Sequence, residues 1–316
     1  MAHFRVVSLA LVLIASANAQ KTPDGYPDLQ GIWNIGTVTP MERPAQLAGK
    51  AFFTPAEARD WEKTITSRTN RDERQTRGTD ADVAAAYNEA WYEPGTRVVR
   101  TLRTSVVVDP PDGKIPALTP AAQKAIADRR AAQQRAMRGP EDRSLGERCL
   151  YFPTLGPPLT PWGYNNNYSI VQTKDYVAIS VEMIHDTRII PIDLSSMNLP
   201  SVTTPHLPKD VRLWAGDSRG HYEGNALVVD TTNFTDKNSF RGSDANLHVV
   251  ERFTRMDNDT ILYRFTIDDP TAFTKPWSGE YTLASSPGPI FEYACHEGNY
   301  ALPNLLRGAQ VQENKK

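Results

Sequence analysis

The sequence predicts a mainly β protein, in which an antiparallel sheet curls into a barrel or sandwich in the second half of the chain. Short runs that favour strands follow one another from residue 164 onward. Short turns separate them with no helical pattern between, which is typical of an antiparallel sheet. Helical patterns are confined to earlier residues. We therefore expect residues 20–150 to form strands and helices that pack on a barrel core of residues 151–316.

Residues 1–19 have the pattern of a secretory signal peptide. A basic start with His3 and Arg5 precedes an apolar run over residues 6–15, and small residues end the segment at Ala19. The run is shorter than the roughly 20 residues that a spanning helix needs, and no later segment is apolar for that long. No cysteine stands directly after the apolar run, where a lipid would be attached, which argues against a lipoprotein. The sequence predicts a periplasmic or secreted protein without a membrane anchor.

The charge balance and the absence of certain motifs limit the classes of partner and cofactor that we expect. The chain has 35 Lys and Arg against 37 Asp and Glu, and it lacks the concentrated basic stripe of a nucleic-acid binder. It also lacks a glycine-rich nucleotide loop and a haem attachment motif, which disfavours a redox cofactor. The roughly 297 residues after residue 19 are enough to bury a large core. We expect a small-molecule substrate or ligand and no nucleic acid.

The N-terminal segment begins with a predicted strand over residues 28–33. A helix is predicted over residues 55–67, because Thr54 and Glu57 form a capping box around a proline at the first helical position. Residues 68–79 are charged and lack apolar side chains, so they should form an exposed loop.

Three further elements are predicted before residue 150. Apolar residues at helical spacing indicate a helix over residues 80–91. A strand over residues 103–109 ends at the Pro-Pro-Asp-Gly turn of residues 110–113. A mostly solvated helix should cover residues 119–137, where Gly139 and Pro140 follow.

The second half of the chain contains the predicted barrel strands. Along residues 260–267, Ile261, Tyr263 and Phe265 share one face, and polar side chains take the other. The predicted strands are residues 168–172, 176–184, 188–192, 212–216, 227–231, 249–255, 260–267, 281–284 and 290–296.

Several of these segments together resemble a largely uncharacterised family of exported bacterial proteins. The matching segments are residues 109–113, 142–149, 164–168, 182–186, 216–220, 230–234, 251–255 and 293–300. The resemblance implies a lipocalin-type (calycin-like) β-barrel with helical decoration, and it implies no reaction. The chain departs from the family over residues 193–206, where a longer segment lacks the arginine of relatives and leaves the role of His206 open.

The two cysteines, Cys149 and Cys295, favour one long-range disulfide in an oxidising compartment. The alternative is a nucleophilic Cys295 beside His296. Adjacent residues of a strand point to opposite faces, so these two would not pair there.

Residues 216–220 match G-x-S-x-G, the nucleophile elbow of α/β-hydrolases. That elbow needs a helix after the serine, whereas here another strand follows. We interpret the segment as a hairpin turn and do not assign Ser218 as a nucleophile.

A metal site is an alternative that the histidines leave open. No His-x-His or His-x₃-His pair anchors one, so no ligand set and no cofactor is predicted, although a divalent metal is possible. The residues that could contribute from separate strands are His185, His221, His248, His296, Glu182, Asp186, Glu223 and Glu297.

The preferred hypothesis is metal-independent acid–base chemistry at the mouth of the barrel, because imidazole and carboxylate groups brought together there can exchange protons near neutral pH. The histidines would act as base or acid, the carboxylates as their partners and the tyrosine as a donor. The candidate catalytic residues are His185, His296, Glu182, Asp186, Glu297 and Tyr293. Candidate substrate-binding residues, chosen for anionic, carbonyl or other polar substrate atoms, are Arg188, Arg252, Tyr164, Asn166 and Tyr168.

Three classes of function follow. The density of titratable groups favours an enzyme of lyase, isomerase or hydrolase type. A lipocalin-like binding protein for a small hydrophobic or aromatic ligand is the alternative, because Tyr263, Phe265 and Phe291 place aromatic side chains in predicted strands. A structural or interaction protein of the envelope is the third.

Overall fold

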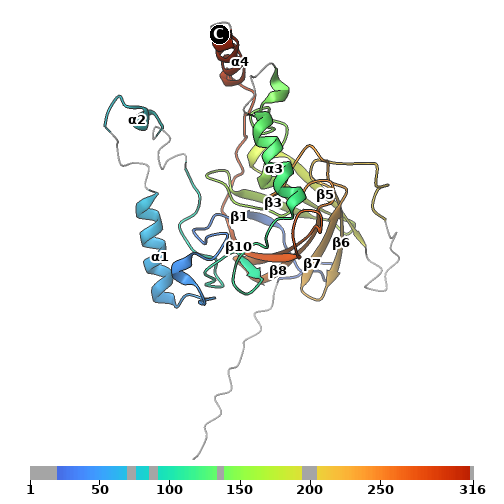
Figure 1. The fold of residues 1–316 in the computed structure, drawn as a ribbon. Coiled ribbons are helices and arrows are strands. Elements are labelled where there is room, and N and C mark those ends of the chain that lie inside the picture. Colours follow the sequence, from blue (N-terminus) through green and yellow to red (C-terminus); the bar gives the residue numbers. More distant parts are fainter. Residues whose placement is uncertain (1–19, 70–75, 85–91, 134–138, 194–204, 314–316) are drawn as a thin grey trace, which may run out of the picture.

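The computed structural model describes residues 20–69, 76–84, 92–133, 139–193 and 205–313. The predicted signal peptide, residues 1–19, lies outside the described residues. The described chain forms a closed barrel of nine strands with few helices (Figure 1). The described sheet has ten strands, of which all but β2 form the ring: β1 (Gly31–Asn34), β2 (Val107–Asp109), β3 (Asn167–Gln172), β4 (Tyr176–Val181), β5 (Thr187–Asp193), β6 (Asp217–Glu223), β7 (Ala226–Thr232), β8 (His248–Asp257), β9 (Thr260–Asp268) and β10 (Trp277–Ser285).

The ring closes through a strand from the N-terminal segment. Strands β3 to β10 follow one another in chain order, and β1 pairs antiparallel with both β3 and β10. The short strand β2 adds to β10. The barrel therefore takes its closing strand from residues 20–150.

One pair in the ring is parallel. Ile192 of β5 lies opposite Gly220 of β6, and Asp193 lies opposite His221. Parallel neighbours cannot be joined by a tight hairpin, so the chain must travel back along the barrel before β6 begins. The described end of this crossover, residues 205–216, contacts β6 and β7 on the outside of the barrel.

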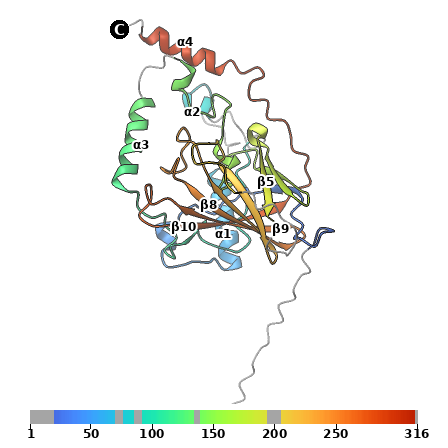
Figure 2. The ribbon, with the colours of Figure 1, turned by 90° about the vertical axis from the view of Figure 1, so that its right-hand side faces the viewer.

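In the described residues, four α-helices and four short 3₁₀ helices decorate the barrel. The capping box of α1 is confirmed: the Glu57 amide donates to Thr54 Oγ1, and the Thr54 amide donates to a Glu57 carboxylate oxygen. Figure 2 shows α3 along one side of the barrel and α4 standing off its end. The helices are α1 (Pro55–Arg68), α2 (Asp80–Ala84), α3 (Pro120–Gln133), α4 (Ala301–Glu313), η1 (Ala45–Leu47), η2 (Pro140–Asp142), η3 (Pro153–Leu155) and η4 (Met183–His185).

Some predicted elements differ from those observed. Residues 290–296 form no strand, because β1 and β2 already occupy the free edge of β10. The C-terminal helix α4 was not predicted. Residues 212–216 make only an isolated bridge between Leu213 and Phe234. Parts of the helices predicted over residues 80–91 and 119–137 lie outside the described residues.

The interior of the barrel is filled by large side chains around one ion pair. Both terminal nitrogens of Arg188 on β5 donate to Glu251 on β8, at 2.7 and 3.0 Å. Tyr263 donates to the same carboxylate at 2.8 Å, and its oxygen accepts the Leu159 amide at 2.8 Å. Burial, followed by the charge of Glu251, raises the pKa of the Tyr263 phenol. The fully buried aromatic side chains include Trp33, Trp277, Tyr168, Tyr263, Tyr281, Phe253 and Phe265.

Residues 153–160, which we call the cap segment, close one end of this interior. The Tyr168 hydroxyl donates to the Thr154 carbonyl at 2.7 Å, and the Leu159 amide reaches Tyr263. Leu155 and Leu159 are buried. The cap segment is thus fixed by hydrogen bonds from two strands of the barrel wall.

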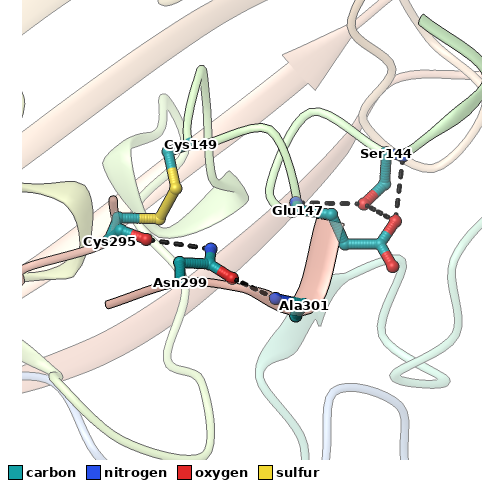
Figure 3. The surroundings of a disulfide bond; sticks show 6 residues. All are labelled: Ser144, Glu147, Cys149, Cys295, Asn299 and Ala301. Atoms are coloured by element: carbon teal, nitrogen blue, oxygen red, sulfur yellow. Dashed lines mark hydrogen bonds between the residues drawn. A yellow bond between two sulfur atoms is a disulfide. The ribbon is translucent and has the colours of Figure 1, made fainter. Parts of the chain in front are cut away.

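The predicted disulfide is confirmed between Cys149 and Cys295, whose Cα atoms are 5.9 Å apart (Figure 3). Neither cysteine is free. The Asn299 side chain donates to the Cys295 carbonyl and accepts the Ala301 amide where α4 begins. The disulfide therefore ties the segment before the cap to the tail that leads into α4. Within the described part of the chain, no helix is long and apolar enough to cross a membrane.

Replacing Glu251 by Ala should leave the Arg188 charge in the barrel interior without its ionic partner. We expect the free energy of unfolding to fall by about 3–5 kcal/mol, as for other broken buried ion pairs. Urea denaturation measures this loss. The matched control is Glu223→Ala, which removes a carboxylate from an exposed pair with Arg252 and should cost about 0–1 kcal/mol. Equal losses in the two variants would contradict the role given to the buried pair.

Replacing both cysteines by serine should destabilise the fold through the unfolded chain. The disulfide joins residues 146 positions apart, and the chain-entropy model gives a loss of up to about 5 kcal/mol. Thermal unfolding with and without reductant measures the effect. The wild type should lose stability on reduction, and the double variant should not respond.

Candidate functional site

The outer face of β6, β7 and β8 carries a connected cluster of charged and polar side chains. Side chains alternate along β6, so Ser218, Gly220 and Tyr222 point inward while every second residue from Asp217 points outward. His206 joins this surface from the crossover. We call the set the outer-face cluster; it comprises His206, Asp217, Arg219, His221, Glu223, Asp230, His248 and Arg252.

His206 lies between two carboxylates. Its Nδ1 is 2.9 Å from Asp217 Oδ2, and its Nε2 is 2.9 Å from Asp230 Oδ1. A neutral imidazole donates from only one nitrogen, so both bonds donate together only when the ring is an imidazolium. The Leu207 amide also donates to Asp217 Oδ2. His206 thereby fastens the crossover to two strands.

Asp230 also binds His248, whose Nε2 lies 2.7 Å from Asp230 Oδ2. The hydrogen bond to Asp230 raises the pKa of His248 above its ordinary value, against partial burial, which lowers it. The same bond lowers the pKa of Asp230, and His206 adds to the effect. The pairing therefore favours the imidazolium form of His248 and the carboxylate form of Asp230.

Arg219 lies between β6 and the crossover. It donates to Asp217 Oδ1 at 2.6 Å and to the Pro205 carbonyl at 3.1 and 3.0 Å. The guanidinium is thus fixed in place, with its charge next to the cavity described below.

His221 is oriented by a carboxylate that is itself fixed. Its Nε2 is 2.9 Å from Glu223 Oε1, and Arg252 donates to Glu223 Oε2 at 2.6 Å. The bonds from Arg252 and then His221 lower the pKa of Glu223. Because Glu223 is held as a carboxylate, it favours the tautomer of neutral His221 that carries its proton on Nε2. The Nδ1 lone pair of that tautomer can accept a proton.

A cavity of about 460 Å³ lies beside these groups. It combines two carboxylates, a guanidinium and an imidazole with an apolar wall, and its size suits a small organic molecule. The lining residues are Pro191, Ile192, Asp193, Pro205, Arg219, Gly220, His221 and Asp230.

The candidate catalytic histidines from the sequence lie elsewhere. His185 is exposed at the end of η4, and His296 is exposed on the tail before α4. Asp186 and Glu297 are exposed as well. Among the described residues, no hydrogen bond or ion pair joins either histidine side chain to a predicted carboxylate. Their catalytic role stays a prediction.

Other predicted residues do come together at the tail. The buried Glu182 side chain accepts from Asn167 Nδ2 at 2.9 Å and from the Phe291 amide at 3.2 Å. Tyr293 hydrogen-bonds to Tyr164, and both line a cavity of about 440 Å³ next to the disulfide. Glu182 thus holds the tail against β3.

The predicted substrate-binding residues divide between the interior and the outer face. Asn166 is buried, where its side chain accepts the Trp162 amide and donates to the Glu93 carbonyl. Tyr168 and Arg188 make the interior contacts described above. Arg252 belongs to the outer-face cluster. The observed bonds give these residues structural roles, and contact with substrate stays a prediction.

Four of the five residues of the G-x-S-x-G segment, residues 217–220, belong to strand β6, so the hairpin-turn interpretation was wrong. Ser218 points into the barrel and hydrogen-bonds to Thr231 Oγ1 at 2.9 Å. Among the described residues, no group of three or more His, Cys, Asp or Glu is arranged to hold a metal ion.

Asp217, Arg219 and Asp230 were not among the residues predicted from the sequence. The signal was present, because Asp217, Arg219, His221 and Glu223 alternate at the period of a strand. Interpreting residues 216–220 as a turn concealed it.

No family model, curated protein or solved structure matches the chain. The family resemblance drawn from the sequence therefore stays a prediction, and the structure itself establishes a closed, mostly antiparallel nine-strand barrel.

The pairing of His248 with Asp230 should be visible in titration. We expect the pKa of His248 to lie above 6.5 in the wild type and to fall in Asp230→Asn, because the main cause of its elevation is removed. NMR of the imidazole protons measures both values. Asp186→Asn, which changes an exposed carboxylate outside the cluster, should leave the His248 titration unchanged.

The same pair should make stability depend on pH. The contribution of His248 is complete below its unfolded pKa near 6.5 and is lost as pH rises through its higher folded value. That of Asp230 is complete above 3.8 and is lost as pH falls through its lowered folded value. Asp230→Asn should therefore destabilise most between about pH 4 and 6.5. A loss that urea unfolding finds constant from pH 4 to 9 would contradict the pairing.

Proposed function

We propose that the protein is an enzyme of lyase, isomerase or hydrolase type that acts on a small hydroxylated carbonyl compound by metal-independent acid–base chemistry. The observation that carries the proposal is His221, which lines the outer-face cavity and whose Nε2 lies 2.9 Å from Glu223 Oε1. A base oriented by a second group is the recurring arrangement of proton-transfer sites.

In this proposal His221 Nδ1 removes a proton from a carbon next to the substrate carbonyl. Glu223 stabilises the resulting imidazolium, and Arg252 keeps Glu223 ionised. The proton returns from His221 to a neighbouring atom in an isomerisation, or to a leaving hydroxyl in an elimination.

The other cavity residues would bind the substrate. Arg219 is fixed by Asp217 and the Pro205 carbonyl, so its charge can stabilise the negative oxygen that forms when the proton leaves. The Asp193 and Asp230 carboxylates are acceptors suited to substrate hydroxyl groups. This set favours a hydroxylated carbonyl compound over a purely apolar ligand.

A lipocalin-like binder for a hydrophobic ligand is less well supported. We propose from the sequence resemblance that the barrel is of calycin type, and its closed, mostly antiparallel ring supports this.

The ligand site of a lipocalin is what the structure supports less well. Lipocalin barrels have eight strands and hold their ligand inside. Here Trp33, Tyr263 and Phe265 are fully buried in the interior, so a ligand there would have to displace them.

We also propose that the protein works in the periplasm or outside the cell. The Cys149–Cys295 disulfide supports this, because such bonds persist in oxidising compartments.

Deuterium incorporation tests the proposed proton transfer directly. The protein is incubated in D₂O with hydroxyaldehydes, hydroxyketones and hydroxyacids, and NMR follows exchange at carbon. We expect exchange in at least one compound to persist with a chelator present and to fall at least about 100-fold in His221→Gln. Wild-type exchange in that variant, or none in any compound, would contradict the proposal.

Two control variants separate this site from the one expected from sequence. His185→Gln and His296→Gln change exposed histidines outside the outer-face cluster, and both should exchange at the wild-type rate. Loss of exchange in these variants alone would move the chemistry to the tail and η4.

A further inference from the structure

A second, larger cavity lies between α3, the segment before the cap and two loops of the barrel. It measures about 950 Å³ and shares no lining residue with the outer-face cavity. Its residues combine cations with aromatic rings. The cations are Arg129, Arg143, Arg148 and Lys237, the acid is Glu141, and the aromatic residues are Tyr151, Phe152, Trp162 and Trp214.

The charges of this cavity leave a positive excess. Arg129 pairs with Asp244, and Arg143 pairs with Glu147. With Glu141, three carboxylates stand against four cations, which leaves a formal charge of +1. Among the residues that the structure describes, no carboxylate pairs with Arg148 or Lys237.

The Tyr151 phenol does not offset this charge. It is buried, and burial raises its pKa to about 12, so it stays neutral at neutral pH. It hydrogen-bonds to Asn238, which also lines the cavity. The phenol thus adds a neutral, fixed ring to the wall.

The aromatic walls are built from two ring pairs. Tyr151 and Trp214 stack with centroids 6.4 Å apart, and Phe152 meets Trp162 edge to face at 5.1 Å. Trp162 is 49% exposed although it packs on Phe152, so part of its indole remains accessible. An exposed tryptophan beside a cation is a typical surface for a flat organic ring.

The covalent framework holds one wall in place. Cys149, which follows Arg148 directly, is tied to Cys295 of the tail, and Ser144 and Glu147 of the same segment cap each other (Figure 3). Arg148 is thereby carried on an anchored segment, which reduces the ordering that binding would require.

From these features we infer that the cavity is a binding site for an aromatic monocarboxylate, whose ring lies on Trp162 and Trp214 and whose carboxylate is held by Arg148 with Lys237. A guanidinium binds a planar carboxylate through two parallel bonds, and one negative charge matches the excess of one positive charge. The site is separate from the proposed catalytic cavity, so it would serve a ligand other than the substrate.

Calorimetric titration with 2-naphthoate at low salt tests the inference, with 2-naphthalenemethanol as the neutral analogue. We expect 2-naphthoate to bind with a 1:1 stoichiometry and the neutral compound to bind at least about tenfold more weakly. Arg148→Gln should weaken 2-naphthoate at least about tenfold, and Lys237→Gln, at an exposed position, should weaken it less. Trp162→Ala should also weaken it.

Arg130→Gln is the matched control, because Arg130 is exposed on α3 and does not line the cavity. It should leave the affinity within about twofold of the wild type, as should His221→Gln in the other cavity. Circular dichroism establishes that each variant is folded. The inference is overturned if 2-naphthoate does not bind the wild type, if the neutral analogue binds equally well, or if Arg148→Gln and Lys237→Gln both retain wild-type affinity.

Discussion

The ion pair between Arg188 and Glu251 is the constraint around which the barrel is arranged. The two residues are on β5 and β8, which are not neighbours in the ring, so the pair crosses the interior. Burying either charge alone would cost several kcal/mol, and only close pairing with further hydrogen bonds offsets the loss of water. Tyr263 supplies one such bond and needs the Leu159 amide in turn, which fixes the cap segment over the end of the barrel. Because these contacts fill the interior, the groups that water can reach lie on the outside of the barrel.

The polar cluster of the outer face depends on the parallel pairing of β5 with β6. The returning crossover brings His206 onto Asp217 and Asp230, which belong to adjacent strands. Carboxylates, imidazoles and guanidinium groups meet there at a partly exposed surface, where water still solvates both protonation states. The interior pair has the opposite character, since its two charges are fixed and shielded. The barrel wall thus carries the buried Arg188–Glu251 pair on its inner side and the titratable groups of the outer-face cluster on its outer side.

Local signals in the sequence predicted local structure well. Thr54 and Glu57 form the expected cap, Ile261 and Tyr263 face inward as their spacing indicates, and the two cysteines are bonded. The pairing of strands that lie far apart in the chain could not be predicted from the sequence. Residues 290–296 have strand composition, but β10 is already paired with β1, and nothing local reveals that. The candidate site depended on the register between strands, so His185 and His296 could not be distinguished from His221 and His248, and an alternating β6 was mistaken for a turn.

Closure by β1 has a consequence for how the chain reaches its native state. The partners of Trp33 and Asn34 include Ser285 and Ala284, about 250 residues later, so the ring cannot be completed until nearly the whole chain has been synthesised. Contacts this distant in sequence are formed slowly, because the chain must first be ordered over the intervening length. Until the ring closes, the free edges of β1 and β10 expose unpaired amides and carbonyls, which are templates for association with other chains. Folding of this barrel should therefore be limited by chain completion, and its partly built forms should be the ones that need protection from aggregation.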